Sequence, residues 1–180
     1  MYKCVLKKLH LWGIYKKITM YRVNVLLAGT KEKNFEKKRK LLNRLDGFSI
    51  GEGTKIVGPI VSYGTLTVGK NCWIGTNLRI HGNGSVIIGD CCDLCPEVAF
   101  FTGGHQIGDA SRRAGAGITH HQTVGNGVWI GGRSYIVNDT AIGDGCVIAA
   151  GACVVKDVPA NTLVGGVPAR KLRDLNDEHT

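Results

Sequence analysis

Aliphatic residues recur at every sixth position along most of the chain. The series is broken at Ser62, shifts by two residues after Val86, and returns after a gap that begins at Phe100. Its members are Ile50, Ile56, Val68, Ile74, Ile80, Val86, Ile88, Leu94, Phe100, Val124, Ile130, Ile136, Ile142, Ile148 and Val154. An amphipathic helix needs a period of about 3.6 residues and a half-buried strand one of about 2. A period of six instead predicts a solenoid, in which each hexapeptide forms one short strand and one turn and neighbouring coils stack in parallel.

Two further positions of the hexapeptide are patterned. Glycine often follows the aliphatic residue, and we expect it to allow a tight corner with a positive φ angle. Four residues after the aliphatic one, a small or branched residue should fill the remaining interior space. These positions hold Thr54, Cys72, Cys92, Val98, Val128, Ser134, Thr140, Cys146 and Ala152. The cysteines among them are interpreted as small buried hydrophobes, whereas Cys91, Cys95 and Cys153 should be partly exposed.

The first 46 residues lack this pattern and carry most of the positive charge. They hold 13 of the 23 Lys and Arg residues but only 3 of the 14 Asp and Glu residues, whereas residues 47–180 hold 10 and 11. A neutral body argues against a nucleic-acid-binding protein. Leu41, Leu42 and Leu45 predict a helix that ends at Asp46-Gly47 and caps the first coil. Docking of this basic extension to an anionic membrane surface or to a protein is the alternative.

Several motifs carry a family resemblance. They are F-T-G-G-H at 101–105, V-W-I-G at 128–131, I-G-D-G-C-V-I-A-A-G at 142–151, V-V-K-D-V-P at 154–159 and G-V-P-A-R at 166–170. The pattern resembles the hexapeptide-repeat acyltransferases, and within them the maltose and galactoside O-acetyltransferase group with its capsule-polysaccharide relatives. The resemblance implies an all-β, left-handed parallel β-helix over residues 47–175, after the short helical extension 1–46 and before a tail at 176–180. It also implies a homotrimer, with acetyl-CoA as the acyl donor.

The repeat is interrupted over residues 101–123, which are too many for a corner, so we expect a loop that leaves the solenoid. His105 lies near the start of this loop. Imidazole can accept a proton near neutral pH, which makes His105 a candidate general base for acyl transfer to a hydroxyl group. The resemblance implies the same role, by direct transfer without a covalent acyl-enzyme. Because Gln106 follows where related enzymes often have an acidic residue, a backbone carbonyl or a carboxylate, Glu97 or Asp93, should orient His105.

By the same resemblance, acetyl-CoA lies in a groove between neighbouring subunits. The residues implied as its contacts are Trp129, Gly132, Ala150, Val155, Lys156, Arg170 and Arg173. The family's acceptor-binding positions fall on Gly75 and Asn83, with Glu97 as a further candidate. Both positions differ from the family's asparagine and aspartate, so a sugar or glycan hydroxyl is expected without a specific acceptor.

Other functions stay open at this point. A serine O-acetyltransferase shares much of the C-terminal pattern but usually has a larger helical N-terminal domain. An N-acetyltransferase acting on an amino sugar nucleotide is a second alternative, and a non-catalytic β-helix or a metal-dependent hydratase is a third. We expect no metal, because adjacent histidines such as His120 and His121 usually point apart and no third ligand stands at suitable spacing. With Lys7 and Lys8 interrupting the first apolar stretch, no cleavable signal peptide is expected. The expected location is cytoplasmic, with peripheral contact at the inner membrane surface as an option.

Overall fold

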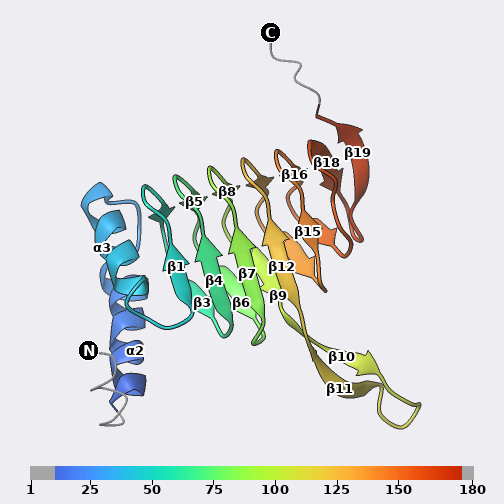
Figure 1. The fold of residues 1–180 in the computed structure, drawn as a ribbon, viewed down its shortest axis with the longest axis horizontal. Coiled ribbons are helices and arrows are strands. Elements are labelled where there is room, and N and C mark those ends of the chain that lie inside the picture. The colour runs from blue at the N-terminus through green and yellow to red at the C-terminus, as the bar shows by residue number, and fades with distance from the viewer. Residues whose placement is uncertain (1–10, 176–180) are drawn as a thin grey trace.

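The computed structural model describes residues 11–175, so the first ten residues of the expected extension and the expected tail at 176–180 lie outside it. The main body is a parallel β-helix of about six turns (Figure 1). Sheet A contains β1 (Phe48–Ile50), β4 (Thr65–Val68), β7 (Ser85–Ile88), β12 (His121–Val124) and β15 (Ala141–Ile142). Sheet B contains β2 (Lys55–Ile56), β5 (Trp73–Ile74), β8 (Asp93–Leu94), β13 (Trp129–Ile130), β16 (Val147–Ile148), β18 (Thr162–Gly165) and the antiparallel β19 (Arg170–Asp174). Sheet C contains β3 (Ile60–Ser62), β6 (Leu78–His81), β9 (Ala99–Phe101), β14 (Tyr135–Val137) and β17 (Cys153–Val154).

The interior of the solenoid is filled as the repeat predicts. Every member of the aliphatic series is at most 3% exposed, and every small residue four positions later is at most 2% exposed. Cys72, Cys92 and Cys146 are among these buried residues, whereas Cys91 is exposed and Cys153 half-buried. The predicted solenoid and the interpretation of its cysteines are therefore confirmed.

The glycines that follow the aliphatic residues do not have positive φ angles, so that part of the prediction is wrong. A Cβ atom on Gly131 would lie 2.5 Å from the backbone nitrogen of Ala150, and one on Gly75 would lie 2.8 Å from the carbonyl oxygen of Leu94. Glycine is needed here because the backbone of the next coil passes directly over it. The positive φ falls two residues later in the turn, as at Asn71 (φ 55°).

The corner that leads from sheet C to sheet A becomes longer over the first three coils and returns to its ordinary length in the fourth. In the first coil, Phe48 pairs with Leu66, 18 residues on. In the second coil, Thr65 pairs with Ser85, 20 residues on, because residues 82–84 lengthen this corner. The two-residue shift seen in the sequence is therefore an enlarged corner.

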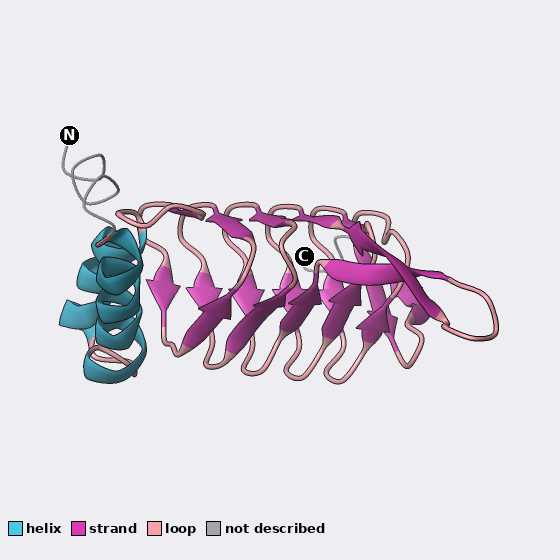
Figure 2. Ribbon diagram, turned by 90° about the horizontal axis from the view of Figure 1, so that it is seen from below, coloured by secondary structure: helices cyan, strands magenta, loops and turns pink. Residues whose placement is uncertain are grey.

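One coil later, a hairpin leaves the solenoid at the same corner. Ser85 pairs with His121, 36 residues on, and the strands β10 (Gly103–Ile107) and β11 (Ala114–Thr119) form an antiparallel arm between them. Figures 1 and 2 show this arm projecting from the solenoid. The shift and the gap in the repeat therefore lie one above the other in the structure.

Helices cover the N-terminal end of the solenoid (Figure 2). They are α2 (Trp12–Tyr21), the π-helix η1 (Arg22–Leu26) and α3 (Glu32–Leu42). Leu42 and Leu45 join the core of the first coil. Helix α3 ends at Leu42, before the expected Asp46-Gly47. The Asn43 side chain bonds to both the backbone N–H (2.7 Å) and the carbonyl (2.9 Å) of Ile50, so the chain turns into β1 earlier than expected.

Candidate active site

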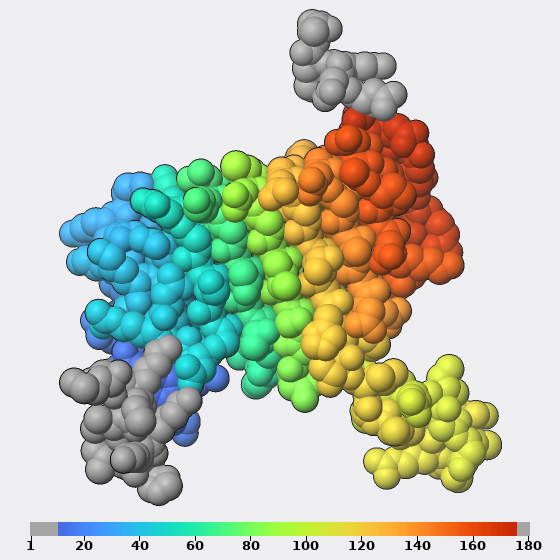
Figure 3. All heavy atoms as spheres, viewed as in Figure 1, coloured from blue at the N-terminus to red at the C-terminus, as the bar shows by residue number. Residues whose placement is uncertain are grey.

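His105 lies on the projecting arm and is exposed (Figure 3, where the arm is the separate yellow-green lobe). It pairs with Gly117 across the hairpin, and the register then shifts between His105 and Ile107, which places a bulge at Gln106. Bulges commonly redirect a side chain next to an active site. The candidate base therefore lies on a two-stranded antiparallel hairpin outside the core.

The His105 imidazole is oriented by the opposite strand. Its Nδ1 lies 2.9 Å from the carbonyl oxygen of Gly115. A carbonyl only accepts hydrogen bonds, so Nδ1 carries the proton and donates it, which leaves the lone pair of Nε2 free. Of the orienting groups expected from the sequence, the backbone carbonyl is the one found. This tautomer is the one that can accept a proton from a substrate at Nε2.

Two side chains fasten the base of the arm to the solenoid. The Asp139 carboxylate accepts hydrogen bonds from the backbone N–H of His121 (2.7 Å) and from Nδ1 of His120 (2.9 Å). The bond from His120 holds the pKa of the Asp139 carboxyl below its usual value. The buried Gln122 side chain donates to the carbonyl of Phe101 at 3.0 Å, which ties the strand entering the arm to the strand leaving it. The position of His105 therefore depends on these contacts.

Asn83, an expected acceptor contact, lies at the enlarged corner beside the arm. Its Oδ1 accepts a hydrogen bond from the Thr119 hydroxyl on β11 at 3.1 Å. Gly75, the other expected position, is buried at a different corner, between sheets B and C, beneath the backbone of Leu94. The structure thus brings Asn83, but not Gly75, to the strands that carry His105.

A groove of about 420 Å³ crosses the outer side of sheet C. One end of it lies near the enlarged corner that holds Asn83. It is lined by Asn77, Arg79, His81, Glu97, Ala99, Phe101 and Tyr135. At one end the His81 ring stacks on Phe101, with 5.0 Å between centroids. Near the other end, Glu97 accepts a 2.6 Å hydrogen bond from Nε of Arg133. Glu97 is therefore engaged with Arg133 and does not orient His105. The groove combines aromatic faces with polar groups, as small-molecule sites usually do.

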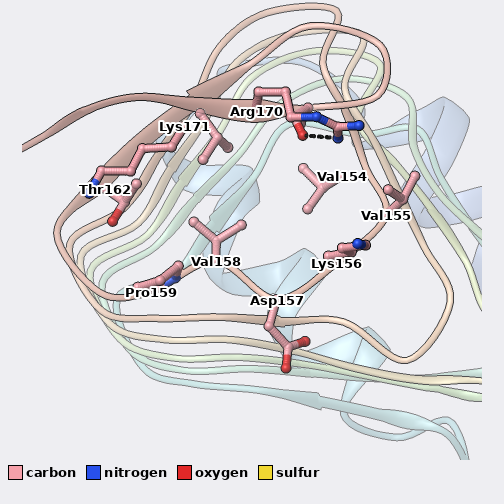
Figure 4. Close-up of a pocket in the computed structure, with 11 residues that line it drawn as sticks. Val154, Val155, Lys156, Asp157, Val158, Pro159, Thr162, Arg170 and Lys171 are labelled. Carbon is pink, nitrogen blue, oxygen red and sulfur yellow. Dashed lines mark hydrogen bonds between the residues drawn. The ribbon is translucent and has the colours of Figure 1, made fainter.

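A second hollow, of about 230 Å³, lies at the C-terminal end of the solenoid (Figure 4). Three of the expected CoA contacts, Val155, Lys156 and Arg170, line it together. Within the described residues, neither Lys156 nor Arg170 forms an ion pair. Two unpaired cations around an apolar hollow can hold phosphate groups.

The remaining expected CoA contacts lie outside this hollow. Gly132 and Ala150 occupy stacked turns between sheets B and C. Trp129 is 54% exposed on sheet B. Its Nε1 donates to the Cys95 sulfur at 3.3 Å. Arg173 is exposed on β19. The expected contacts in one chain are therefore divided between a hollow with two cations and a separate line of turns, and they do not form one closed site.

The adjacent histidines have different partners. His120 bonds to Asp139, while His121 Nδ1 lies 2.7 Å from the Ser85 hydroxyl. Among residues 11–175, no group of three or more His, Cys, Asp or Glu side chains could hold a metal ion.

Known proteins share this architecture. Residues 123–156 match the family model for the bacterial transferase hexapeptide (six repeats). The galactoside O-acetyltransferase of Escherichia coli K12 is 35% identical over 144 residues, which cover 79% of this chain and 70% of the relative. The chain belongs to the hexapeptide-repeat acetyltransferases. Its fold class, the left-handed parallel β-helix, is that of its structural neighbours.

Two solved structures of hexapeptide-repeat acetyltransferases superimpose on most of the chain. A galactoside acetyltransferase in complex with coenzyme A has a TM-score of 0.75 and 33% identity, covering 89% of this chain and 79% of that one. An acetyltransferase from Vibrio cholerae complexed with acetyl-CoA has a TM-score of 0.76 and 27% identity, covering 94% and 90%. A putative acetyltransferase of Saccharomyces cerevisiae is 32% identical over 90% of this chain and 81% of its own length.

Sequence reasoning missed the residues that position the arm of this acetyltransferase. Gln122 carried a detectable signal, because it pairs with Val86 at an inward-facing position that an aliphatic residue fills in the earlier coil. A polar residue at a buried position needs partners, and Gln122 lies at the end of the gap in the repeat, two residues before the series resumes at Val124. Asp139 and Gly115 carried no such signal, since one lies in an exposed turn and the other contributes only its backbone.

Proposed function

We propose that this acetyltransferase transfers an acetyl group from acetyl-CoA to a hydroxyl group of a sugar or glycan precursor, with His105 as the general base. The observation that carries the proposal is the hydrogen bond from His105 Nδ1 to the Gly115 carbonyl, which leaves Nε2 free on an exposed arm. The relatives support the acyl donor, because two solved structures of similar chains contain coenzyme A or acetyl-CoA.

In the proposed reaction, Nε2 of His105 accepts the proton of the acceptor hydroxyl as its oxygen attacks the thioester carbonyl. The tetrahedral intermediate collapses with cleavage of the C–S bond. The CoA thiolate then takes the proton from the imidazolium, which returns His105 to its starting state. The products are the acetyl ester and free CoA, and no acyl-enzyme forms.

The donor phosphates would bind at the C-terminal hollow, where Lys156 and Arg170 provide positive charge. The pantetheine arm would run along the turns that contain Gly132 and Ala150. Small residues there let an extended chain approach the backbone. Trp129 and Arg173 would complete the groove from sheet B and β19.

The acceptor would bind in the sheet C groove, near Asn83. Because the arm projects away from its own solenoid (Figure 3), we place its His105 against the groove of a neighbouring copy in a homotrimer. A site shared between copies would also bring the C-terminal hollow of one chain toward the arm of another. The aromatic face of Phe101 and the polar ends of the groove suit a sugar ring.

The test is release of the CoA thiol from acetyl-CoA in the presence of sugars, glycosides, amino sugar nucleotides and L-serine. His105→Ala should reduce turnover at least ~100-fold with little change in acetyl-CoA binding. His121→Ala is the matched control, since it removes an exposed imidazole at the base of the same arm, and it should retain most activity.

Turnover that depends on His105 with a hydroxylated sugar supports the proposal. Turnover with L-serine alone, or with only the amino sugar nucleotide, would replace the proposed acceptor. A chain that fails to bind acetyl-CoA by calorimetry, or a fully active His105→Ala variant, would contradict the mechanism itself.

A further inference from the structure

The N-terminal helical segment exposes a line of large apolar side chains. Its members are Leu11, Ile14, Ile18, Tyr21 and Val25, each between 43% and 57% exposed. Their spacing alternates between three and four residues, so they lie along one side of α2 and η1. We name this surface the N-terminal stripe. The opposite side is also apolar but is packed against the solenoid, where Val23 is fully buried.

Positive charge borders the N-terminal stripe, and negative charge is absent from its segment. At about 100° per residue, Lys17 and Arg22 fall on either side of the stripe. Residues 11–31 also contain Lys16 and Lys31 but no Asp or Glu. The neighbouring carboxylates on α3 are engaged in ion pairs: Glu36 with Arg39 and Lys40, and Glu32 with Lys55.

This combination restricts what can cover the N-terminal stripe. A second copy of the segment would bring Lys17 and Arg22 beside identical cations, with no carboxylate in residues 11–31 to pair with them. A bilayer that contains anionic phospholipids offers an apolar layer and negative phosphates at the same boundary. The 15 residues of α2 and η1 span about 22 Å, less than the ~20-residue length that crosses a bilayer, so the segment would lie in the membrane plane.

We infer that the N-terminal stripe docks on the surface of an anionic phospholipid bilayer. Ile14 and Ile18 enter the boundary of the acyl chains, while Lys17 and Arg22 face the lipid phosphates. The arm strands β10 and β11, and the C-terminal strands β18 and β19 beside which the hollow lies, are away from α2 (Figure 1), so the arm and the hollow remain open when the helix is docked. The inference does not depend on the identity of the acceptor.

The experiment is flotation of the full chain with vesicles of phosphatidylcholine alone and with vesicles that also contain phosphatidylglycerol. Wild type should float only with the anionic vesicles, and its binding should fall as salt increases. The double variant Ile14→Gln/Ile18→Gln should bind about 10-fold more weakly or worse. Lys17→Gln/Arg22→Gln should weaken binding and reduce its salt dependence.

The matched control is Ile107→Gln, the same substitution at a more exposed isoleucine on the arm, which should bind vesicles like wild type. Circular dichroism would check that each variant is folded. Equal vesicle binding by wild type and Ile14→Gln/Ile18→Gln would overturn the inference, as would binding that ignores lipid charge. A smaller oligomeric mass of this variant, with no vesicle binding by wild type, would instead identify the stripe as a contact between copies and overturn the membrane assignment.

Discussion

Lys38 is a charged side chain in an apolar location, and its titration should control part of the fold's stability. It is fully buried on α3. Its Nζ donates to the carbonyl oxygens of Gly29 and Val57, both at 3.0 Å, and lies 4.7 Å from the centroid of the Phe35 ring. Burial lowers the pKa of Lys38 to about 8, because removal from water disfavours the ammonium form.

The magnitude follows from the two pKa values. In the unfolded chain the pKa of a lysine is about 10.4. Between pH ~8 and ~10.4 the unfolded state therefore binds more protons than the folded state, and the free energy of unfolding rises with pH. From pH ~7 to ~10 the titration of Lys38 raises the free energy of unfolding by about 2 kcal/mol. Below the pKa of Lys38 in the folded protein, the folded and unfolded states both carry the charge, so this rise in the free energy of unfolding is absent.

Lys38→Met removes the titrating group while keeping a long side chain at the site. Urea unfolding followed by circular dichroism, at neutral pH and near pH ~10, gives the change in the free energy of unfolding for each protein. Wild type should gain about 2 kcal/mol relative to the variant, because all other groups titrate in both. Equal changes in the two proteins would refute the reasoning from the buried amine, as would a relative loss by wild type.

Further predictions concern the stacked coils, the arm and the C-terminal hollow. Gly131→Ala should lower the free energy of unfolding by about 2 kcal/mol, because its methyl group meets the next coil. Gly13→Ala, at an open helical position, should raise it by ~0.5–1 kcal/mol, and urea titration measures both. Asp139→Asn should speed amide exchange in the arm without altering global unfolding, and wild type should show the same loosening as pH falls through the lowered pKa of Asp139. Lys156→Gln and Arg170→Gln should each raise the KM for acetyl-CoA about 10-fold with kcat nearly unchanged, and an unchanged KM would exclude the hollow as the phosphate site.

The solenoid was predictable because its burial is decided locally. Ile130 and Ile148 each face the interior because each occupies the aliphatic position of its own hexapeptide. The six-residue period of the sequence is therefore also the period of the packing. The glycine prediction failed because the pattern does not distinguish a residue that needs an unusual backbone angle from one that must leave room for the backbone of the next coil. At Gly131 the second requirement holds, and the angle is displaced two residues along the turn, to Arg133 (φ 58°).

The candidate site was predictable only in part. The break in the repeat and the motif around it indicated His105, but its partner Gly115 depends on hairpin pairing and on the bulge at Gln106. The N-terminal segment showed no single apolar face in the sequence because α2 is apolar on two sides. One side of α2, continued by Val23 in η1, packs on the solenoid. The other side, which includes Ile18, is exposed.

The length of the arm determines how such a chain can change over evolutionary time. Ser85 and His121 are 36 residues apart, twice the 18-residue step of an ordinary coil. The ends of the arm meet where the backbone N–H of His120 donates to the carbonyl of Thr102 at 2.9 Å. Excision of residues 103–120 would therefore restore an ordinary coil and leave every inward-facing side chain in phase. The solenoid and the arm that carries His105 are therefore separable parts of the chain, so a single deletion or insertion at this corner would remove or exchange the arm without rebuilding the solenoid.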